Sequence, residues 1–550
     1  MQENNNFLQQ EITPQPQNET PQQFGEQVYA PRPPFELTKH DGIFALCALA
    51  SSIFTGLFGI FNGFALGYLI SSVLLIAVFS LYFIKSQKLR AFPLSCIILS
   101  LAISVIFVTT TNISVKFFGL LTNFLLAIIG IDNLAFGKTV GNRDTLGVFY
   151  RVASAMGNIG VTLKSVFSNS NGNKKPIGKI MFGLLCALPI LTIIIPLLLS
   201  DDAFSGMMSS IFNNSNVFSI IFKVVFGAAL SMLVVSYGLS LKFGRVSKIK
   251  EWDFAGIDNT YIISFLSAIS LCYLLYLFSQ LAYFFSAFKG FLPNGDITYS
   301  EYARKGFFEM CVIAVINLTL VFLSMLFSKK NDGKVCKGIK IMATFITVFT
   351  LIIIATSISK MVLYINEYGM TVLRLTTSAF MIFLGVAFLA VILRIYLNGI
   401  NVVKTVAVTA GIIVLLLGIA NVNGICAKYN YDAYKSQKMQ TIDVEAMYKL
   451  GDDGIPYLTK LACSKDRTVA LKAQEYLAKA YMKGYFIDMD DIDEFDADSL
   501  KEHQKYTGFS YYNLPQSRAY NALYKFIENN PQFDDYCIEK YNRSFLDKFW

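Results

Sequence analysis

Long apolar stretches recur along most of this chain, and short polar segments separate them. A helix needs about 20 predominantly apolar residues to cross a bilayer, so each stretch of this length predicts one membrane-spanning helix. The pattern predicts about eleven spans, at residues 43–61, 64–84, 93–110, 113–131, 180–199, 217–241, 261–288, 307–327, 341–363, 375–393 and 406–420. We therefore expect an all-α, polytopic integral membrane domain over residues 43–420.

The two ends of the chain follow a different pattern. Residues 1–39 are rich in Gln, Asn, Pro and Glu, and they hold too little apolar surface to offset the entropy of ordering them. We expect a disordered cytoplasmic tail there. Residues 421–550 instead contain short amphipathic patterns, which predict a small soluble α-helical domain. These patterns lie at 444–450, 455–463, 468–482 and 518–528.

Basic residues fall mainly on alternate segments between the predicted spans. Those on the opposite side are Lys116, Lys289, Arg304, Lys305, Lys360 and Arg374. Because segments rich in Lys and Arg stay in the cytoplasm, we expect the N-terminus to be cytoplasmic. An odd number of spans then places residues 421–550 outside the cytoplasm, and the expected location is the plasma membrane.

Composition narrows the classes of function. Hydrophobic residues make up 54% of the 550 residues and charged residues 15%, whereas about 25% charged is usual for a soluble protein. The lipid bilayer is therefore the expected partner of most of the chain. The net charge of +9 is spread over short segments instead of one soluble surface, so no nucleic-acid partner is expected.

Residue types that carry metal and catalytic chemistry are scarce. The chain has two histidines and no closely spaced cysteine pair, which is a poor supply for a zinc site or a Ser-His-Asp triad. The acidic stretch 488–498 lacks the central Gly and the final Glu of an EF-hand loop. We expect no metal and no cofactor, and the chain shows no obvious catalytic set.

Two polar segments interrupt the apolar pattern in the second half of the chain. In the first polar segment, residues 299–309, Glu301, Lys305 and Glu309 recur every four positions, so they share one stripe if the segment is helical. The second polar segment, residues 364–374, lies on the same predicted side of the membrane. Charge at a membrane is costly and often tied to a role. The candidate functional cluster is Tyr302, Arg304, Lys305, Glu309, Glu367, Tyr368, Arg374 and Lys223.

The longest predicted cytoplasmic loop carries an amphipathic pattern over residues 145–167. Its apolar residues recur every three or four positions, while Arg151 and Lys164 lie off that stripe. A basic amphipathic helix between two spans is typical of the membrane interface. Docking of a cytoplasmic partner is the alternative.

At the two polar segments the sequence resembles a bacterial family of multi-pass membrane proteins, domain of unknown function 4173. The matching stretches are Tyr-Ala-Arg-Lys-Gly-Phe-Phe-Glu at 302–309 and Leu-Tyr-Ile-Asn-Glu-Tyr-Gly-Met-Thr-Val-Leu-Arg-Leu at 363–375. Weaker similarity lies at 199–204, 278–284 and 427–430. The resemblance implies a multi-pass membrane protein and carries no known activity.

Three classes of function remain. The first is a structural, sensory or envelope-associated membrane component that binds an envelope or protein partner through residues 421–550. The second is a transporter or channel, in which Lys223, Gln280, Lys305, Glu309 and Asn317 would line one path. The third is a membrane enzyme acting on lipid or wall precursors with outer carboxylates. The absence of an obvious catalytic set favours the first.

Overall fold

The computed structural model describes residues 35–61, 64–84, 90–136, 142–168, 194, 198, 215–244, 257–289, 299–329, 335–397, 400–481, 509–533 and 536–537. Long helices dominate these ranges. They are α1 (Lys39–Phe54), which continues as a π-helical stretch (Thr55–Ile60), α2 (Leu66–Ile84), α3 (Ala91–Ser104), α5 (Ile113–Phe136), α10 (Ser215–Lys242), α11 (Asn259–Lys289), α12 (Tyr299–Phe327), α13 (Lys337–Tyr368), α14 (Val372–Tyr396) and α15 (Val402–Ile419).

Ten helical stretches among the described residues are long and apolar enough to cross a membrane. The expectation of an all-α, polytopic membrane protein is therefore confirmed. Apart from two single residues, the predicted span 180–199 lies outside the described ranges, as do residues 1–34 of the expected tail and the acidic stretch 488–498.

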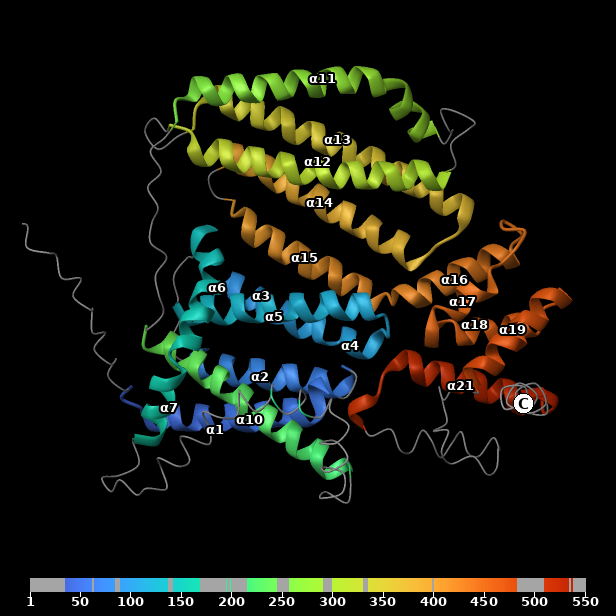
Figure 1. Cartoon of the computed structure of the whole chain (residues 1–550), viewed down its shortest axis with the longest axis horizontal. Helices are drawn as coiled ribbons and strands as arrows, with labels where there is room; N and C mark the ends of the chain where they lie inside the picture. The colour runs from blue at the N-terminus through green and yellow to red at the C-terminus, as the bar shows by residue number, and fades with distance from the viewer. Residues whose placement is uncertain are drawn as a thin grey trace, which may run out of the picture.

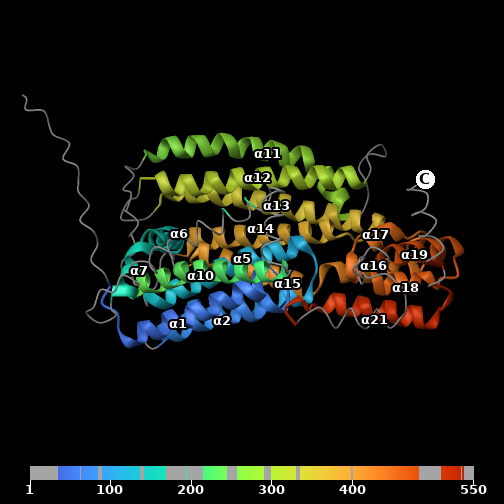
Figure 2. The ribbon, with the colours of Figure 1, turned by 60° about the horizontal axis from the view of Figure 1, so that its bottom comes forward.

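The spanning helices lie side by side along the long axis of the molecule (Figure 1). Helices α11–α14 form one part of the bundle. Helices α1–α5, which include the short α4 (Ile106–Thr109), form the other part together with α10. Helix α15 lies between the two parts, because it packs against α14 on one side and against α3 and α5 on the other. Figure 2, from a second direction, likewise shows α11–α14 on one side of the bundle and α1 and α2 on the other. In both views α10 and α12 lie in different parts of the bundle.

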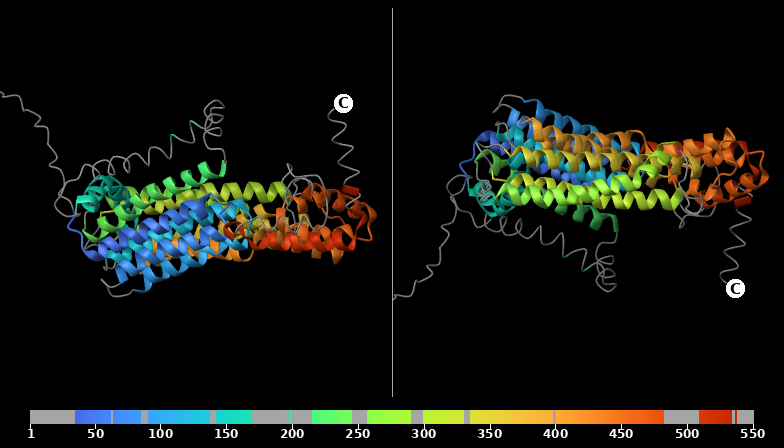
Figure 3. Two further views of the ribbon diagram at one scale, coloured as in Figure 1. Left: turned by 90° about the horizontal axis from the view of Figure 1, so that it is seen from below. Right: turned by 90° about the horizontal axis from the view of Figure 1, so that it is seen from above.

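The described residues after α15 form a compact helical domain beyond one end of the bundle, seen in both views of Figure 3. We call this end the junction end. The domain consists of α16 (Val422–Lys435), α17 (Val444–Tyr448), a 3-10 turn (Gly451–Asp453), α18 (Ile455–Ala462), α19 (Arg467–Ala480), a second 3-10 turn (Phe509–Tyr511) and α21 (Leu514–Asn529).

Two shorter helices cover the opposite end of the bundle. The predicted amphipathic segment 145–167 is broken into α6 (Asn142–Gly157) and α7 (Ile159–Ser168). Asn158 lies between the two helices, and its side-chain amide donates to Ser240 Oγ on α10 at 3.1 Å. This hydrogen bond stabilises the break. Arg151 on α6 binds the buried Asp132 at the end of α5 through two bonds of 2.7 and 2.6 Å. These contacts hold α6 across the ends of the spanning helices.

Polar side chains inside the bundle bind one another across helices. The amide of Asn123 on α5 donates to the carbonyl oxygen of Ser100 at 2.7 Å and to Ser104 Oγ at 2.8 Å, both on the neighbouring helix α3. In the other part of the bundle, Asn317 on α12 donates to Thr350 Oγ1 on α13 at 2.8 Å. Within lipid an unpaired polar group is costly, so these pairs fix how the helices face one another.

Close packing of α1 against α10 depends on glycine. A Cβ atom on Gly227 of α10 would lie 2.6 Å from Ile53 Cα and 2.7 Å from the carbonyl oxygen of Ser52. Both are backbone atoms of α1, which cannot move aside without separating the helices. Gly42, also on α1, has open space where its Cβ would lie.

We expect Gly227→Ala to lower the stability of the purified protein by roughly 1–3 kcal/mol, as overpacking in a tight core does. Gly42→Ala is the matched control and should be neutral or slightly stabilising, because Ala favours a helix over Gly. Thermal unfolding in detergent measures both. Equal melting temperatures for the two variants would contradict the close helix approach.

Candidate functional site

The structure brings most of the sequence-predicted cluster to one end of the bundle. Tyr302, Arg304 and Lys305 lie in the first turns of α12, and their side chains are outside the described part. The rest of the cluster at this end is Glu309 on α12, Glu367 and Tyr368 at the end of α13, and Arg374 at the start of α14. The first polar segment is thus helical, which is the condition under which Glu301, Lys305 and Glu309 share one stripe.

Lys223 lies apart from these residues. It is on α10, where its backbone oxygen faces Gly56 of the π-helical stretch that continues α1. Figure 1 shows α10 at the bottom of the bundle and α12 near the top. The structure therefore does not bring Lys223 to the polar segments.

The second polar segment forms the turn between α13 and α14. Gly369 has a positive φ of 78°, which favours glycine. The Arg374 guanidinium donates to the carbonyl oxygen of Tyr368 at 2.9 Å and also to that of Gly369. It lies over the ring of Tyr364, 3.9 Å from the ring centroid. Arg374 thereby satisfies carbonyl groups that the end of a helix leaves unpaired.

Asn430 fastens this turn to the C-terminal domain. Its side-chain amide accepts from the backbone N–H of Met370 at 2.9 Å and donates to the Met370 carbonyl at 2.9 Å. Asn430 lies on α16, so the paired bonds join α16 to the α13–α14 turn. Residues 427–430 were one of the weaker matching stretches in the sequence, and they include this asparagine.

A charged pair lies nearby on the spanning helices. Glu309 of α12 is exposed on the surface of the bundle. Lys360, on the adjacent helix α13, lies within electrostatic reach of its carboxylate, and so does Tyr276 of α11. Opposite charges on neighbouring helices lower the cost of holding either one at the membrane.

A second polar cluster, which sequence reasoning missed, joins the bundle to the C-terminal domain. Asn421 turns the chain from α15 into α16 with a left-handed φ of 53°. Its amide donates to Asp453 Oδ1 at 2.5 Å. Asn423 accepts from the amide of Asn112, between α4 and α5, at 2.8 Å, and it donates to the Leu450 carbonyl at 3.1 Å. We call Asn112, Asn421, Asn423, Asp452 and Asp453 the junction cluster.

Two adjacent carboxyl groups are buried in the junction cluster. Asp452 is 7% exposed and Asp453 is 6% exposed, and one oxygen of each has no hydrogen-bond partner among the described residues. Burial raises the pKa of Asp452 to about 6, although the charge of Lys116 lowers it. Burial likewise raises the pKa of Asp453 to about 6 against the hydrogen bond from Asn421.

Lys116 connects this acidic pair to the membrane helices. It lies at the start of α5, and its ammonium donates to the carbonyl oxygen of Phe64 at 2.9 Å. Phe64 has a left-handed φ of 49° just before α2. The charge of Lys116 also acts on Asp452. A single side chain thus contacts the α2 corner and faces the C-terminal domain.

A continuous hydrophobic core lies behind these polar contacts. Buried residues of α3, α4 and α5, such as Ile103, Ile106 and Leu126, belong to the same packed cluster as Leu458 and Leu477 of the C-terminal domain. On another side, the backbone N–H of Leu66 at the start of α2 donates to the Tyr512 carbonyl at 3.2 Å. The C-terminal domain and the adjoining membrane helices therefore pack as one unit.

These features define an all-α, multi-pass membrane protein whose C-terminal helical domain is docked on the end of its bundle. The chain belongs to the family described as domain of unknown function (DUF4153), whose model matches residues 73–461. Membership of a family of unknown function is thus confirmed, but the matched family is 4153 and not 4173. The match runs from within α2 to the end of α18 but one residue, and it includes the junction cluster. No curated protein and no solved structure matches the chain.

We expect the stability of the protein to rise as pH falls from about 6 toward the unfolded carboxyl pKa of 3.8. Between these two pH values, Asp452 and Asp453 bind more protons in the folded protein than in the unfolded chain. Their ionisation above about pH 6 therefore destabilises the folded state. A shift of about two units corresponds to roughly 3 kcal/mol per carboxyl.

The measurement is thermal unfolding between pH 4 and 7.5 for the wild type and Asp452→Asn. The wild type should gain about 1–3 kcal/mol relative to the variant on acidification. Glu528→Gln removes an exposed carboxyl of α21 and is the control, which should follow the wild type. A variant curve parallel to the wild type across this range would contradict the burial of Asp452.

Proposed function

We propose that this protein is an envelope-associated membrane component that holds its C-terminal helical domain in a fixed position at the membrane surface for a partner. The observation that carries the proposal is the docking of that domain through the junction cluster, Asn430 and a shared hydrophobic core. A domain on a flexible tether would not need buried side chains that bind the membrane helices.

The orientation belongs to the same proposal. The positive-inside rule places the N-terminus in the cytoplasm and the junction end outside the plasma membrane. Asp452 and Asp453 add a sensory element, because buried carboxyl groups with a pKa of about 6 change charge within the pH range of an exposed envelope compartment.

A cysteine-labelling experiment tests the orientation. In a background without native cysteines, Lys465→Cys in the C-terminal domain should react with an impermeant maleimide in intact cells. Tyr150→Cys, on exposed α6 at the opposite end, should react only after lysis. The reverse pattern would show that the C-terminal domain is cytoplasmic.

Transport remains the second candidate because of one observation. The opposite charges of Glu309 and Lys360 act on each other across adjacent spanning helices, and charged residues in spans often mark a translocation path. Lys223, another member of the path expected from sequence, is on the far helix α10. The pair alone does not make a route through the bundle, so fixed presentation of the C-terminal domain is the better-supported function.

Complementation of a strain that lacks the protein separates the two candidates. Asn430→Ala combined with Asn421→Ala removes junction contacts that are worth roughly 1–3 kcal/mol each. We expect this variant to reach the membrane at normal levels and to fail in restoring resistance to envelope stress. Glu309→Gln combined with Lys360→Met should complement like the wild type.

Lys428→Ala, on the exposed face of α16, is the matched control for the junction variant and should also complement. If the Glu309/Lys360 variant failed while the junction variant complemented, the presentation of the C-terminal domain would be refuted in favour of transport.

A further inference from the structure

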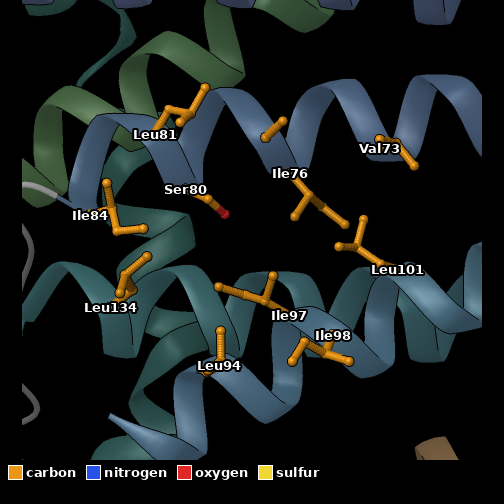
Figure 4. A pocket seen from close by; sticks show the side chains of 11 residues that line it. Val73, Ile76, Ser80, Leu81, Ile84, Leu94, Ile97, Ile98, Leu101 and Leu134 are labelled. Carbon is orange, nitrogen blue, oxygen red and sulfur yellow. The ribbon is translucent and has the colours of Figure 1, made fainter. Parts of the chain in front are cut away.

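An apolar crevice of about 380 Å³ lies between α2, α3 and α5. Figure 4 shows Ile76, Ile97 and Leu101 on its walls, with side chains from α2 and α3 facing each other across the gap. The volume is in the range of small-ligand pockets, which run from about 300 to 1,000 Å³. Apart from Ser80, the side chains that line the crevice are aliphatic.

The crevice opens toward the lipid-facing surface of the bundle. Leu81 and Ile98 line it and are 67% and 57% exposed, and both lie within helical stretches long and apolar enough to span a membrane. The surrounding medium at this depth is hydrocarbon. An acyl chain is the apolar group that fits such a groove.

Ser80 supplies a polar group inside the crevice. Its oxygen points into the gap in Figure 4, and it is buried with no hydrogen-bond partner among the described residues. Ser71, on the same helix, instead donates to the carbonyl oxygen of Gly67 at 2.7 Å. Ser80 lies one turn before the end of α2, and the end of a spanning helix meets the polar interfacial region of a bilayer.

The end of the crevice carries positive charge. Ile84 is the last residue of α2 and Leu94 lies in the first turn of α3, and both line the crevice. Arg90 is exposed at the N-cap of α3. The N-cap side chain makes no capping hydrogen bond to the first backbone N–H groups of this helix. An Arg side chain and open N–H groups at a helix start together attract a phosphate.

We propose that this crevice binds one anionic phospholipid. One acyl chain fills the apolar gap, the Ser80 hydroxyl donates to an ester carbonyl, and the phosphate lies at Arg90 and the start of α3. The site is at the opposite end of the bundle from the junction, and it does not depend on the proposed function of the C-terminal domain.

Native mass spectrometry of the full chain, released from nanodiscs of equal phosphatidylglycerol and phosphatidylcholine, tests the proposal. The wild type should retain one phosphatidylglycerol molecule in preference to phosphatidylcholine. Arg90→Gln should reduce that preference about fivefold, since one basic residue near a membrane surface contributes on the order of 1 kcal/mol. Ser80→Leu fills the crevice and should abolish retention of either lipid.

Two matched controls make the result specific. Ser95→Leu introduces the same change at an exposed position of α3 that does not line the crevice, and Lys39→Gln removes an exposed charge at the start of α1. Both should behave like the wild type. An unchanged lipid preference in Arg90→Gln would overturn the proposal, even if Ser80→Leu failed to fold. Lipid retention by a folded Ser80→Leu variant equal to that of the wild type would also overturn it. Either result would mean that the bound lipid is general boundary lipid.

Discussion

A single left-handed asparagine determines how the two parts of this protein meet. Asn421 ends α15 and begins α16, and its side chain is bound to Asp453 in the turn before α18. Such a backbone conformation is unfavourable for most residues, but asparagine tolerates it. The turn directs α16 along the α13–α14 hairpin, where Asn430 can reach Met370. The position of the whole C-terminal domain depends on this corner.

The corner follows the end of a spanning helix, so the surroundings of the chain change from apolar to polar over a few residues. Helix α15 needs no polar contacts along its apolar surface, whereas α16 must cover the ends of other helices. Thr109 donates to the Gly418 carbonyl of α15 at 3.0 Å within the bundle, whereas Asn112 binds Asn423 of α16. Polar groups at the bundle end are therefore paired partly with α15 and partly with the C-terminal domain.

Much of the architecture could be predicted from the sequence because lipid imposes a simple rule on it. Apolar stretches of about 20 residues predict spanning helices. The structure has a long helix at each predicted span that falls within the described residues. The first polar segment was harder to interpret. Hydropathy marks it as a break, yet α12 begins at Tyr299, because charged residues are compatible with a helix that extends beyond the membrane.

The junction cluster could not be found from the sequence for a different reason. Asn112 and Asn423 are 311 residues apart in the chain, and neither belongs to a recognisable motif. Asp452 and Asp453 between two glycines look like a solvated turn, and only the packing of α18 and α21 around them shows that they are buried. Arg374 was a candidate functional residue in the sequence, and in the structure its contacts with Tyr368 and Gly369 close a turn.

The C-terminal domain and the membrane helices form one unit through the junction cluster, Asn430 and the shared core. Pulsed electron-spin resonance in nanodiscs measures this directly, with spin labels on the exposed positions Leu121 of α5 and Leu471 of α19 in a background without native cysteines. We expect one narrow distance distribution, which broadens when Asn421 and Asn430 are replaced by alanine. A broad distribution in the protein with both asparagines intact would contradict it.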